Sequence, residues 1–122
     1  MRNRPGYSLW KNAGYALDGF AEVLRNETAF KIEVTIAVVV WICLIFVPLP
    51  LIAKAVLGLS FFPVLIAELA NSAIERVVDL ATLEHHKLAK YAKDAGSAMV
   101  LFSVIFTILI WISTLSILYI GS

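Results

Sequence analysis

The chain has 122 residues, of which 61% are hydrophobic, and its mean hydropathy is +0.87. A soluble chain of this composition would expose large apolar patches, so the composition excludes an ordinary soluble protein and favours a single-domain integral membrane protein. The formal net charge of +1 gives no sign of a nucleic-acid partner, and we expect none.

The first predicted element is an amphipathic helix over residues 8–25. Apolar residues recur there at steps of three and four, with charged and amide residues between them. Because this helix precedes a membrane span, we expect it to lie in the plane of the membrane interface. The stretch "RNET" that follows predicts a bend before the first span.

Three apolar segments follow, and each is long enough to span a bilayer, which takes about 20 residues. We predict spans over residues 29–47, 50–70 and 96–120, with the second helix continuing into the cytosol to about residue 81. The stretch "VPLPL" permits only a tight turn between the first two spans, and we expect Pro63 to kink the second. Residues 82–93 are polar and poorly periodic, which predicts a loop or a short helix.

Basic residues are distributed unevenly along the chain. They gather before the first span and in the 76–96 segment, whereas the connection between the first two spans carries none. By the positive-inside rule, the N-terminus and the 76–96 segment are cytoplasmic and the C-terminus lies on the other side of the membrane.

A stripe of polar residues begins where the second span ends. At 100° per residue, Glu75 and Asp79 fall within about 20° of Glu68, and Asn71 and Ser72 flank them. Carboxylates at the edge of the hydrocarbon layer cost free energy unless something uses them. The stripe therefore favours a functional site at the cytosolic membrane interface.

More charged residues lie at the cytosolic ends of the other two spans, namely Glu27, Glu33, Lys93 and Asp94. Mg²⁺ prefers one or two carboxylates together with phosphate oxygens and water. A lysine can neutralise charge on a transferring phosphoryl group, and a carboxylate at the interface can serve as a general base. The pattern favours phosphoryl transfer, although the sequence holds neither a P-loop nor a protein-kinase glycine loop.

Two other interpretations of the stripe stay open. A membrane glutamate is a common proton carrier, but a proton-coupled transporter places it near the midplane rather than at the edge. A polar stripe can also do no more than hold a helix bundle together. His85 and His86 are metal-ligand residue types, but a zinc site needs three or four convergent ligands, so we favour contact with a nucleotide or the loop.

Two segments, "AELANSAIERVVDL" and "LAKYAKDAGSAMV", resemble the small bacterial membrane diacylglycerol kinase family. The family signature E-[IL]-x-N-[ST]-A-I-E-x-x-x-D is matched from Glu68 to Asp79, and the A-K-D-x-[GA]-[SA]-A element from Ala92 to Ala98. The stretch "NETAFKIE" resembles the N-terminal element of the family. One departure is Ser8, which stands where the family usually has an arginine, and that contact is left unassigned.

The resemblance implies an all-α homotrimer in the bacterial inner membrane, with one surface helix and three spans per protomer and the C-terminus in the periplasm. Each active site would lie between neighbouring subunits. The implied reaction is ATP-dependent phosphorylation of diacylglycerol to phosphatidic acid with Mg²⁺, and the alternative substrate within the family is undecaprenol. The stretches "NETAFKIE" and "KDAGSA" resemble the diacylglycerol branch.

The resemblance also implies roles for individual residues. Glu68 corresponds to the catalytic base, and Asn71 and Asp79 to polar positions needed for the integrity of the site. Metal-binding positions are Glu27 and Glu75; nucleotide-contacting positions are Tyr15, Glu84, His86, Lys93 and Asp94, and we place Glu27, Glu75 and His85 beside the nucleotide as well. Lys93 is also expected to stabilise charge on the phosphates. Ser97 falls where the lipid is contacted, and we expect Glu68 and Glu33 to face the lipid too.

Overall fold

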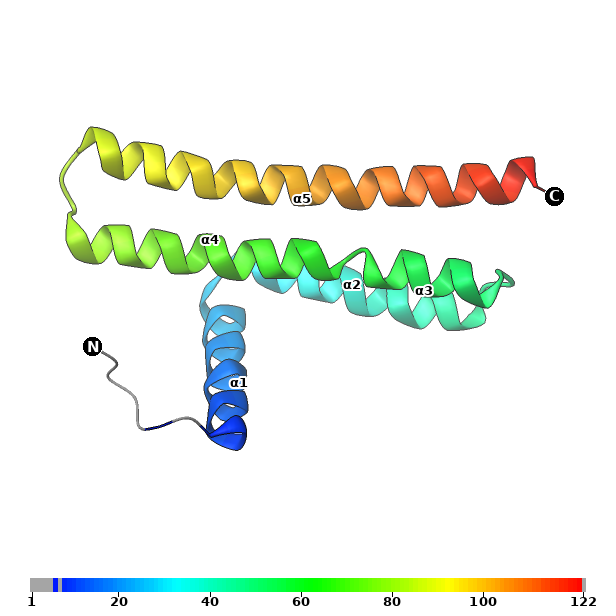
Figure 1. Cartoon of the computed structure of the whole chain (residues 1–122), viewed down its shortest axis with the longest axis horizontal. Helices are drawn as coiled ribbons and strands as arrows, with labels where there is room; N and C mark the ends of the chain where they lie inside the picture. The colour runs from blue at the N-terminus through cyan, green and yellow to red at the C-terminus, as the bar shows by residue number, and fades with distance from the viewer. Residues whose placement is uncertain (1–5, 7, 122) are drawn as a thin grey trace.

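The computed structural model describes residues 6 and 8–121, and every regular element within these residues is an α-helix (Figure 1). The elements are α1 (Leu9–Asn26), α2 (Thr28–Phe46), α3 (Leu51–Leu59), α4 (Phe62–Ala81) and α5 (Lys87–Ile120). Three stretches are long and apolar enough to cross a membrane, namely α2, the α3–α4 segment and α5. The all-α membrane class predicted from hydropathy is therefore confirmed.

Helix α1 extends away from the side of the bundle formed by the other helices, in a direction that crosses theirs (Figure 1). Ser8 caps its N-terminus, because the Ser8 hydroxyl accepts a hydrogen bond from the Lys11 amide at 3.4 Å. At the other end, Glu27 has an extended backbone that turns the chain into α2. The Phe20 ring meets the buried Phe30 ring edge to face, with centroids 5.4 Å apart, and this contact anchors α1 on α2.

The second predicted span is interrupted, so that α3 ends at Leu59 and α4 begins at Phe62, with Pro63 in its first turn. Proline lacks the amide hydrogen that would continue the backbone ladder, and an unpaired carbonyl is costly inside a membrane. Side chains of α5 donate hydrogen bonds to Ser60, within the break. The Thr107 hydroxyl donates to the Ser60 carbonyl at 2.7 Å, and the Trp111 indole donates to the Ser60 hydroxyl at 3.0 Å.

Helix α5 runs beside α4 and begins at Lys87, earlier than the polar segment 82–93 predicts (Figure 1). The His86 ring caps it by accepting a hydrogen bond from the Leu88 amide at 3.1 Å, so only residues 82–86 form a loop. The 34 residues of α5 measure roughly 50 Å at 1.5 Å each, whereas the hydrocarbon layer is about 30 Å thick. The first turns of α5 therefore project beyond the apolar layer.

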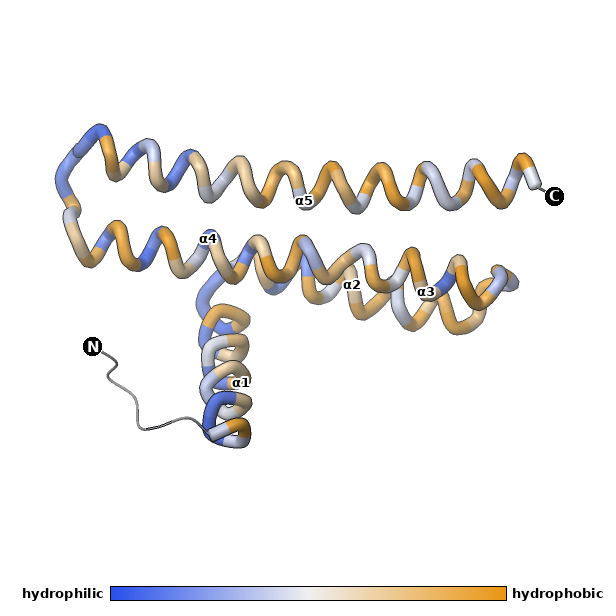
Figure 2. Tube along the Cα trace, in the orientation of Figure 1, coloured by the Kyte–Doolittle hydropathy of each residue, from blue (hydrophilic) through white to orange (hydrophobic). Residues whose placement is uncertain are grey.

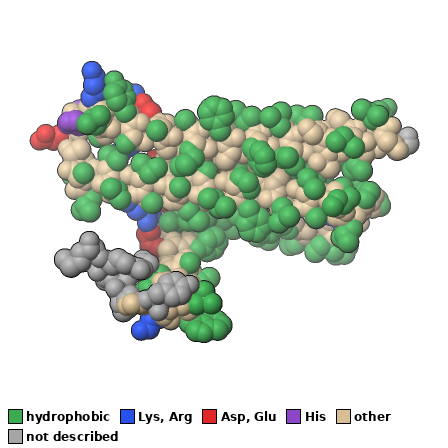
Figure 3. Space-filling view, in the orientation of Figure 1, with side chains coloured by type: hydrophobic (Ala, Val, Ile, Leu, Met, Phe, Trp, Pro, Cys, Tyr) green, Lys and Arg blue, Asp and Glu red, His purple; other side chains and the backbone are tan. Residues whose placement is uncertain are grey.

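Polar and apolar residues separate along the length of the molecule. Figure 2 shows that hydrophilic residues gather at the end where α1 and the α4–α5 loop lie, while the rest of the bundle is mostly apolar. In Figure 3, charged side chains lie mainly at that same end, and hydrophobic side chains cover the visible face of α4 and α5. Many of these apolar side chains are exposed on the chain, as expected for helices that face lipid.

Candidate functional site

The polar stripe of α4 lines a cavity of about 150 Å³ beneath the junction of α1 and α2. We call it the carboxylate cavity. Its polar walls are formed by Glu68, Asn71, Ser72 and Glu75 of α4, together with Glu27 from the α1–α2 junction. The helical repeat brings Glu68 and Glu75, two turns apart, to the same side of α4. Three carboxyl groups, two from α4 and one from the α1–α2 junction, thus share one small space.

Glu27 is held firmly at the wall of the carboxylate cavity. Its Oε1 accepts a hydrogen bond from the buried Ser72 hydroxyl at 2.7 Å and forms an ion pair with Arg76 at 3.1 Å. A second nitrogen of the same guanidinium, Nη1, forms an ion pair with Glu22 of α1. Arg76 thus joins α4 to both α1 and the α1–α2 junction.

The Arg76 guanidinium that hydrogen-bonds Glu22 also changes how that carboxyl titrates. It holds the pKa of Glu22 below its usual value of 4.5, because the donated hydrogen bond and the positive charge both favour the ionised form. Asn26 adds a further hydrogen bond to the same carboxylate, at 2.8 Å. Glu22 is therefore ionised at neutral pH and keeps Arg76 attached to α1.

Asn71 lies between the carboxylate cavity and α5. Its amide nitrogen donates to Glu75 Oε1 at 3.4 Å, which orients that carboxylate. Its Oδ1 faces Gly96 so closely that a Cβ added at Gly96 would overlap with it, and the added Cβ would lie 3.3 Å from the Asn71 Cγ. The absence of a side chain at Gly96 is therefore what allows Asn71 to occupy its position.

A second cavity, of about 320 Å³, lies between the end of α4, the 82–86 loop and the start of α5; we call it the loop cavity. Its lining includes Asp79, Glu84, His85, His86, Lys90, Lys93 and Asp94. The Lys93 ammonium is 2.6 Å from Asp79 Oδ1, and the Lys90 ammonium is 2.5 Å from Asp94 Oδ2. These pairs are exposed to solvent, so both lysines remain accessible to an anion entering from water.

Glu33 belongs to neither cavity wall. It lines an apolar groove of about 290 Å³ between α2, α4 and α5, whose other walls include Phe61, Val64 and Ile108. The Glu33 carboxyl also lies close enough to that of Glu68 to interact with it. Glu33 thus connects the apolar groove to the carboxylate cavity.

The structure separates some residues that the sequence groups together. Asp79 shares the α4 face expected from its spacing but lies in the loop cavity with Lys93, one turn beyond the carboxylate cavity. Tyr15 is half-buried in the middle of α1 and Ser97 is exposed on α5, and neither lines the two cavities or the apolar groove. Their predicted contacts with nucleotide and lipid stay predictions.

Two residues of the site, Arg76 and Glu22, were not singled out from the sequence. They lie 54 positions apart, and no periodicity or motif connects them. The sequence shows only that α1 carries an acidic residue and that α4 carries a basic one, which is weak evidence for an ion pair between them. Their pairing depends on the angle at which α1 crosses α4, which sequence patterns do not specify.

The donor set of the carboxylate cavity fits a hard divalent cation. Glu27 and Glu75 both offer carboxylate oxygens, and Mg²⁺ takes one or two carboxylates and completes its shell with phosphate oxygens and water. Within the described residues, no three His, Cys, Asp or Glu side chains form a ready-made metal cluster.

Residues 14–115 match a family model described as prokaryotic diacylglycerol kinase. A diacylglycerol kinase of Escherichia coli (strain K12) is 36% identical over 110 residues, covering 89% of this chain and 90% of that protein. A diacylglycerol kinase of Pseudomonas aeruginosa is 41% identical over 85 residues, covering 70% of this chain and 69% of the relative. An undecaprenol kinase of Bacillus subtilis (strain 168) is 39% identical over 98 residues, covering 80% of each chain.

Proposed function

The chain belongs to the prokaryotic diacylglycerol kinase family and is a lipid kinase, and we propose that it transfers the γ-phosphoryl group of ATP to the hydroxyl of diacylglycerol. The product would be phosphatidic acid, which stays in the bilayer and supports phospholipid recycling. The observation that carries this proposal is the carboxylate cavity, whose wall on α4 begins at Glu68, directly after the apolar run of that helix. A diacylglycerol hydroxyl lies at that depth in a membrane.

The apolar groove supports a lipid acceptor. It extends from Glu33, beside Glu68, along apolar side chains that include Val64 and Ile108. An acyl chain in this groove would leave its glycerol hydroxyl near the two carboxyl groups. By burying the acyl chain, the groove would position the hydroxyl for reaction, although the groove itself does not contact the reacting atoms.

Glu68 is the residue we assign as general base. It lies half-buried in the wall of the carboxylate cavity, within reach of a hydroxyl that enters from the apolar groove. Glu68 takes the hydroxyl proton, and the hydroxyl oxygen forms a bond to the γ-phosphorus. The bond between that phosphorus and the β,γ-bridging oxygen breaks, and ADP leaves. Glu68 then returns its proton to water.

The loop cavity is our proposed nucleotide site. Lys93 would contact the phosphates, with Asp79 holding its ammonium in place, while Glu84, His85, His86 and Asp94 surround the rest of the nucleotide. Glu27 and Glu75 would hold Mg²⁺, which when bound neutralises charge on the phosphates. Asn71 would keep Glu75 oriented through the hydrogen bond between them. Tyr15 would reach the nucleotide only if α1 or a neighbouring subunit brings it closer.

We further propose a homotrimer in the bacterial inner membrane, with the polar end of the bundle in the cytoplasm. The wide exposure of apolar side chains on one protomer supports both lipid and subunit contacts. The basic residues before α2 and in the 76–96 segment support the orientation through the positive-inside rule. A neighbouring subunit would also give Ser97 and Tyr15 a role in a shared site.

Undecaprenol is the second candidate acceptor, because one relative of similar identity is an undecaprenol kinase. Its hydroxyl would be phosphorylated by the same chemistry. Membership of the kinase family argues against the two other interpretations of the stripe, a proton-coupled transporter and a purely structural bundle.

The test is transfer of labelled γ-phosphate from ATP in mixed micelles that contain Mg²⁺ and either diacylglycerol or undecaprenol. We expect diacylglycerol to be phosphorylated and Glu68→Gln to remove the activity while the protein stays folded. Preference for undecaprenol would overturn the acceptor and keep the chemistry. Full activity in Glu68→Gln would overturn the assignment of the base.

A further inference from the structure

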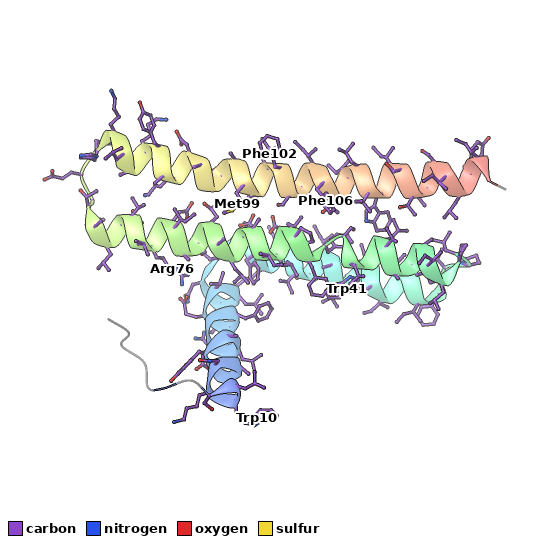
Figure 4. All side chains as sticks on the ribbon, in the orientation of Figure 1. Trp10, Trp41, Arg76, Met99, Phe102 and Phe106 are labelled. Carbon is purple, nitrogen blue, oxygen red and sulfur yellow. The ribbon has the colours of Figure 1, made fainter. Side chains whose placement is uncertain are left out.

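Arg76 is placed where it acts on the carboxylate cavity without lining it. It follows Glu75 on α4, and Figure 4 shows it on the side of α4 from which α1 extends. Its two terminal nitrogens are divided between two carboxylates, Nη1 with Glu22 and Nη2 with Glu27. An arginine can make this bridge because its guanidinium presents several donors in a fixed plane.

The Arg76 bridge and a bound cation would both use the carboxylate of Glu27. Oε1 already accepts from the Ser72 hydroxyl at 2.7 Å and from Arg76 at 3.1 Å. A divalent cation bound by Glu27 would lie close to the guanidinium, and two positive charges at this distance repel each other. Arg76 and the cation therefore compete for Glu27.

The other half of the bridge does not compete. Glu22 lies on α1 outside the carboxylate cavity, and its carboxylate also accepts a hydrogen bond from Asn26. When a cation takes Glu27, the guanidinium can stay attached to α1 through Glu22. Glu27 would thus exchange Arg76 for the cation, whereas Glu22 would keep its ion pair with Arg76.

We propose that Arg76 is a positioning residue that acts as a built-in counter-cation, holding Glu27 in place until a divalent cation displaces it. This inference rests on the proposed function, because it takes Glu27 as a cation ligand. In the cation-free protein Arg76 balances the negative charge of the cavity and keeps α1 docked. Arg76 also weakens cation binding in the absence of nucleotide. When nucleotide phosphates add their attraction for the cation, the cation displaces Arg76 from Glu27.

The experiment measures binding of Mn²⁺ alone, by electron paramagnetic resonance, to the full chain in detergent micelles without ATP or lipid. We expect Arg76→Gln to lower the Kd for Mn²⁺ by about two- to fivefold, the range that corresponds to losing one half-exposed ion pair. Arg76→Lys keeps the charge and should stay closer to wild type. Glu27→Gln should remove most of the Mn²⁺ binding, both in the wild-type protein and in Arg76→Gln.

The matched control is Arg25→Gln, which removes one positive charge two residues before Glu27. None of the ion pairs among the described residues involves Arg25. A general change of electrostatic potential would tighten Mn²⁺ binding equally in Arg25→Gln and Arg76→Gln. That result would overturn the proposal, and so would an unchanged or higher Kd in Arg76→Gln.

A second variant tests the other half of the bridge and does not remove Arg76. Glu22→Gln leaves Glu27 as the one ion-pair partner of the guanidinium among the described residues, so we expect weaker Mn²⁺ binding than in wild type. Asp18→Asn removes an acidic residue one turn earlier on α1 and should change the Kd less. Equal effects of Glu22→Gln and Asp18→Asn would count against the bridge.

The proposal and the kinase function fail in different ways. Wild-type protein that binds Mn²⁺ as expected but transfers no phosphate to any lipid would overturn only the proposed function. Wild-type protein that phosphorylates lipid but shows no Mn²⁺ binding sensitive to Glu27→Gln would overturn Glu27 as a cation ligand, and with it the role of Arg76 as a counter-cation, and would leave the lipid kinase activity standing.

Discussion

The contact between Gly96 and Asn71 can be tested by adding a single carbon atom. In Gly96→Ala the new Cβ would overlap with Asn71 Oδ1 and lie 3.3 Å from its Cγ and 3.7 Å from Ile74 Cδ1. Overpacking of this kind costs about 1–3 kcal/mol, whereas replacing a helical glycine by alanine contributes about 1 kcal/mol of stability. We therefore expect Gly96→Ala to be neutral to destabilising, by up to about 2 kcal/mol.

The sign of the effect should depend on Asn71. In an Asn71→Ala background the overlap is gone, so Gly96→Ala should stabilise the protein by up to about 1 kcal/mol. The four proteins form a double-mutant cycle, with an expected coupling of about 1–3 kcal/mol. The assay is reversible unfolding in mixed detergent micelles, followed by circular dichroism. Kinase activity of the single Gly96→Ala variant should also fall, because a displaced Asn71 no longer orients Glu75.

Gly19→Ala is the matched control, since a Cβ added at Gly19 meets nothing within 4 Å. It should give the same stabilisation in both backgrounds. Additive effects of Gly96→Ala and Asn71→Ala would refute the reasoning, because they would mean that the two side chains do not share the space between α4 and α5.

Three more predictions concern other contacts. Thr107→Val removes the donor to the Ser60 carbonyl and should destabilise the protein by about 0.6–1.7 kcal/mol in the same unfolding assay; unchanged stability would contradict the role of this bond at the helix break. Because Arg76 lowers the pKa of Glu22 below 4.5, the ion pair should stabilise the protein fully above about pH 4.5 and lose this effect as the pH falls through the lowered pKa. The difference in Tm between wild type and Glu22→Gln should therefore shrink in acid, and a constant difference would be evidence against the pair. Lys93→Gln should raise the KM for ATP by roughly tenfold in a kinase assay, since a hydrogen bond to a charged group contributes about 1.5–3 kcal/mol, and an unchanged KM would place the phosphates elsewhere.

The features that the sequence predicts well are those governed by local composition. Continuous apolar runs predict the three membrane-spanning stretches, and Pro63 predicts the interruption between α3 and α4. Local physical chemistry is sufficient here, because an apolar helix satisfies its own backbone in lipid and a proline cannot. The sequence did not predict that α5 begins as early as Lys87. Its first turns are polar and show no clear apolar periodicity, but they contain residues of high helix propensity such as leucine, alanine and lysine.

The carboxylate cavity is only partly predictable for the same reason. The spacing of Glu68 and Glu75 on one helix face follows from the helical repeat, and the cavity contains both. The position of Glu27 against Ser72, in contrast, depends on a contact between residues 45 positions apart. The Arg76 bridge to α1 depends on the angle between two helices. Sequence patterns describe the faces of helices, but the pairing of faces requires the structure.

The order of residues along α4 gives a physical reason for carboxylates at the membrane edge. From the apolar layer outward the helix presents Glu68, then Glu75 roughly 10 Å further along its axis, then Asp79 with its bound Lys93 about 6 Å beyond that. In the proposed function, a lipid hydroxyl would reach Glu68 from the apolar groove, and a nucleotide in the loop cavity would reach Lys93 from water. Glu75 lies between them, where the transferred phosphoryl group and its cation would have to be. In this arrangement α4 would bring a lipid substrate and a water-soluble substrate together, and carboxylates at the membrane edge are placed to contact both.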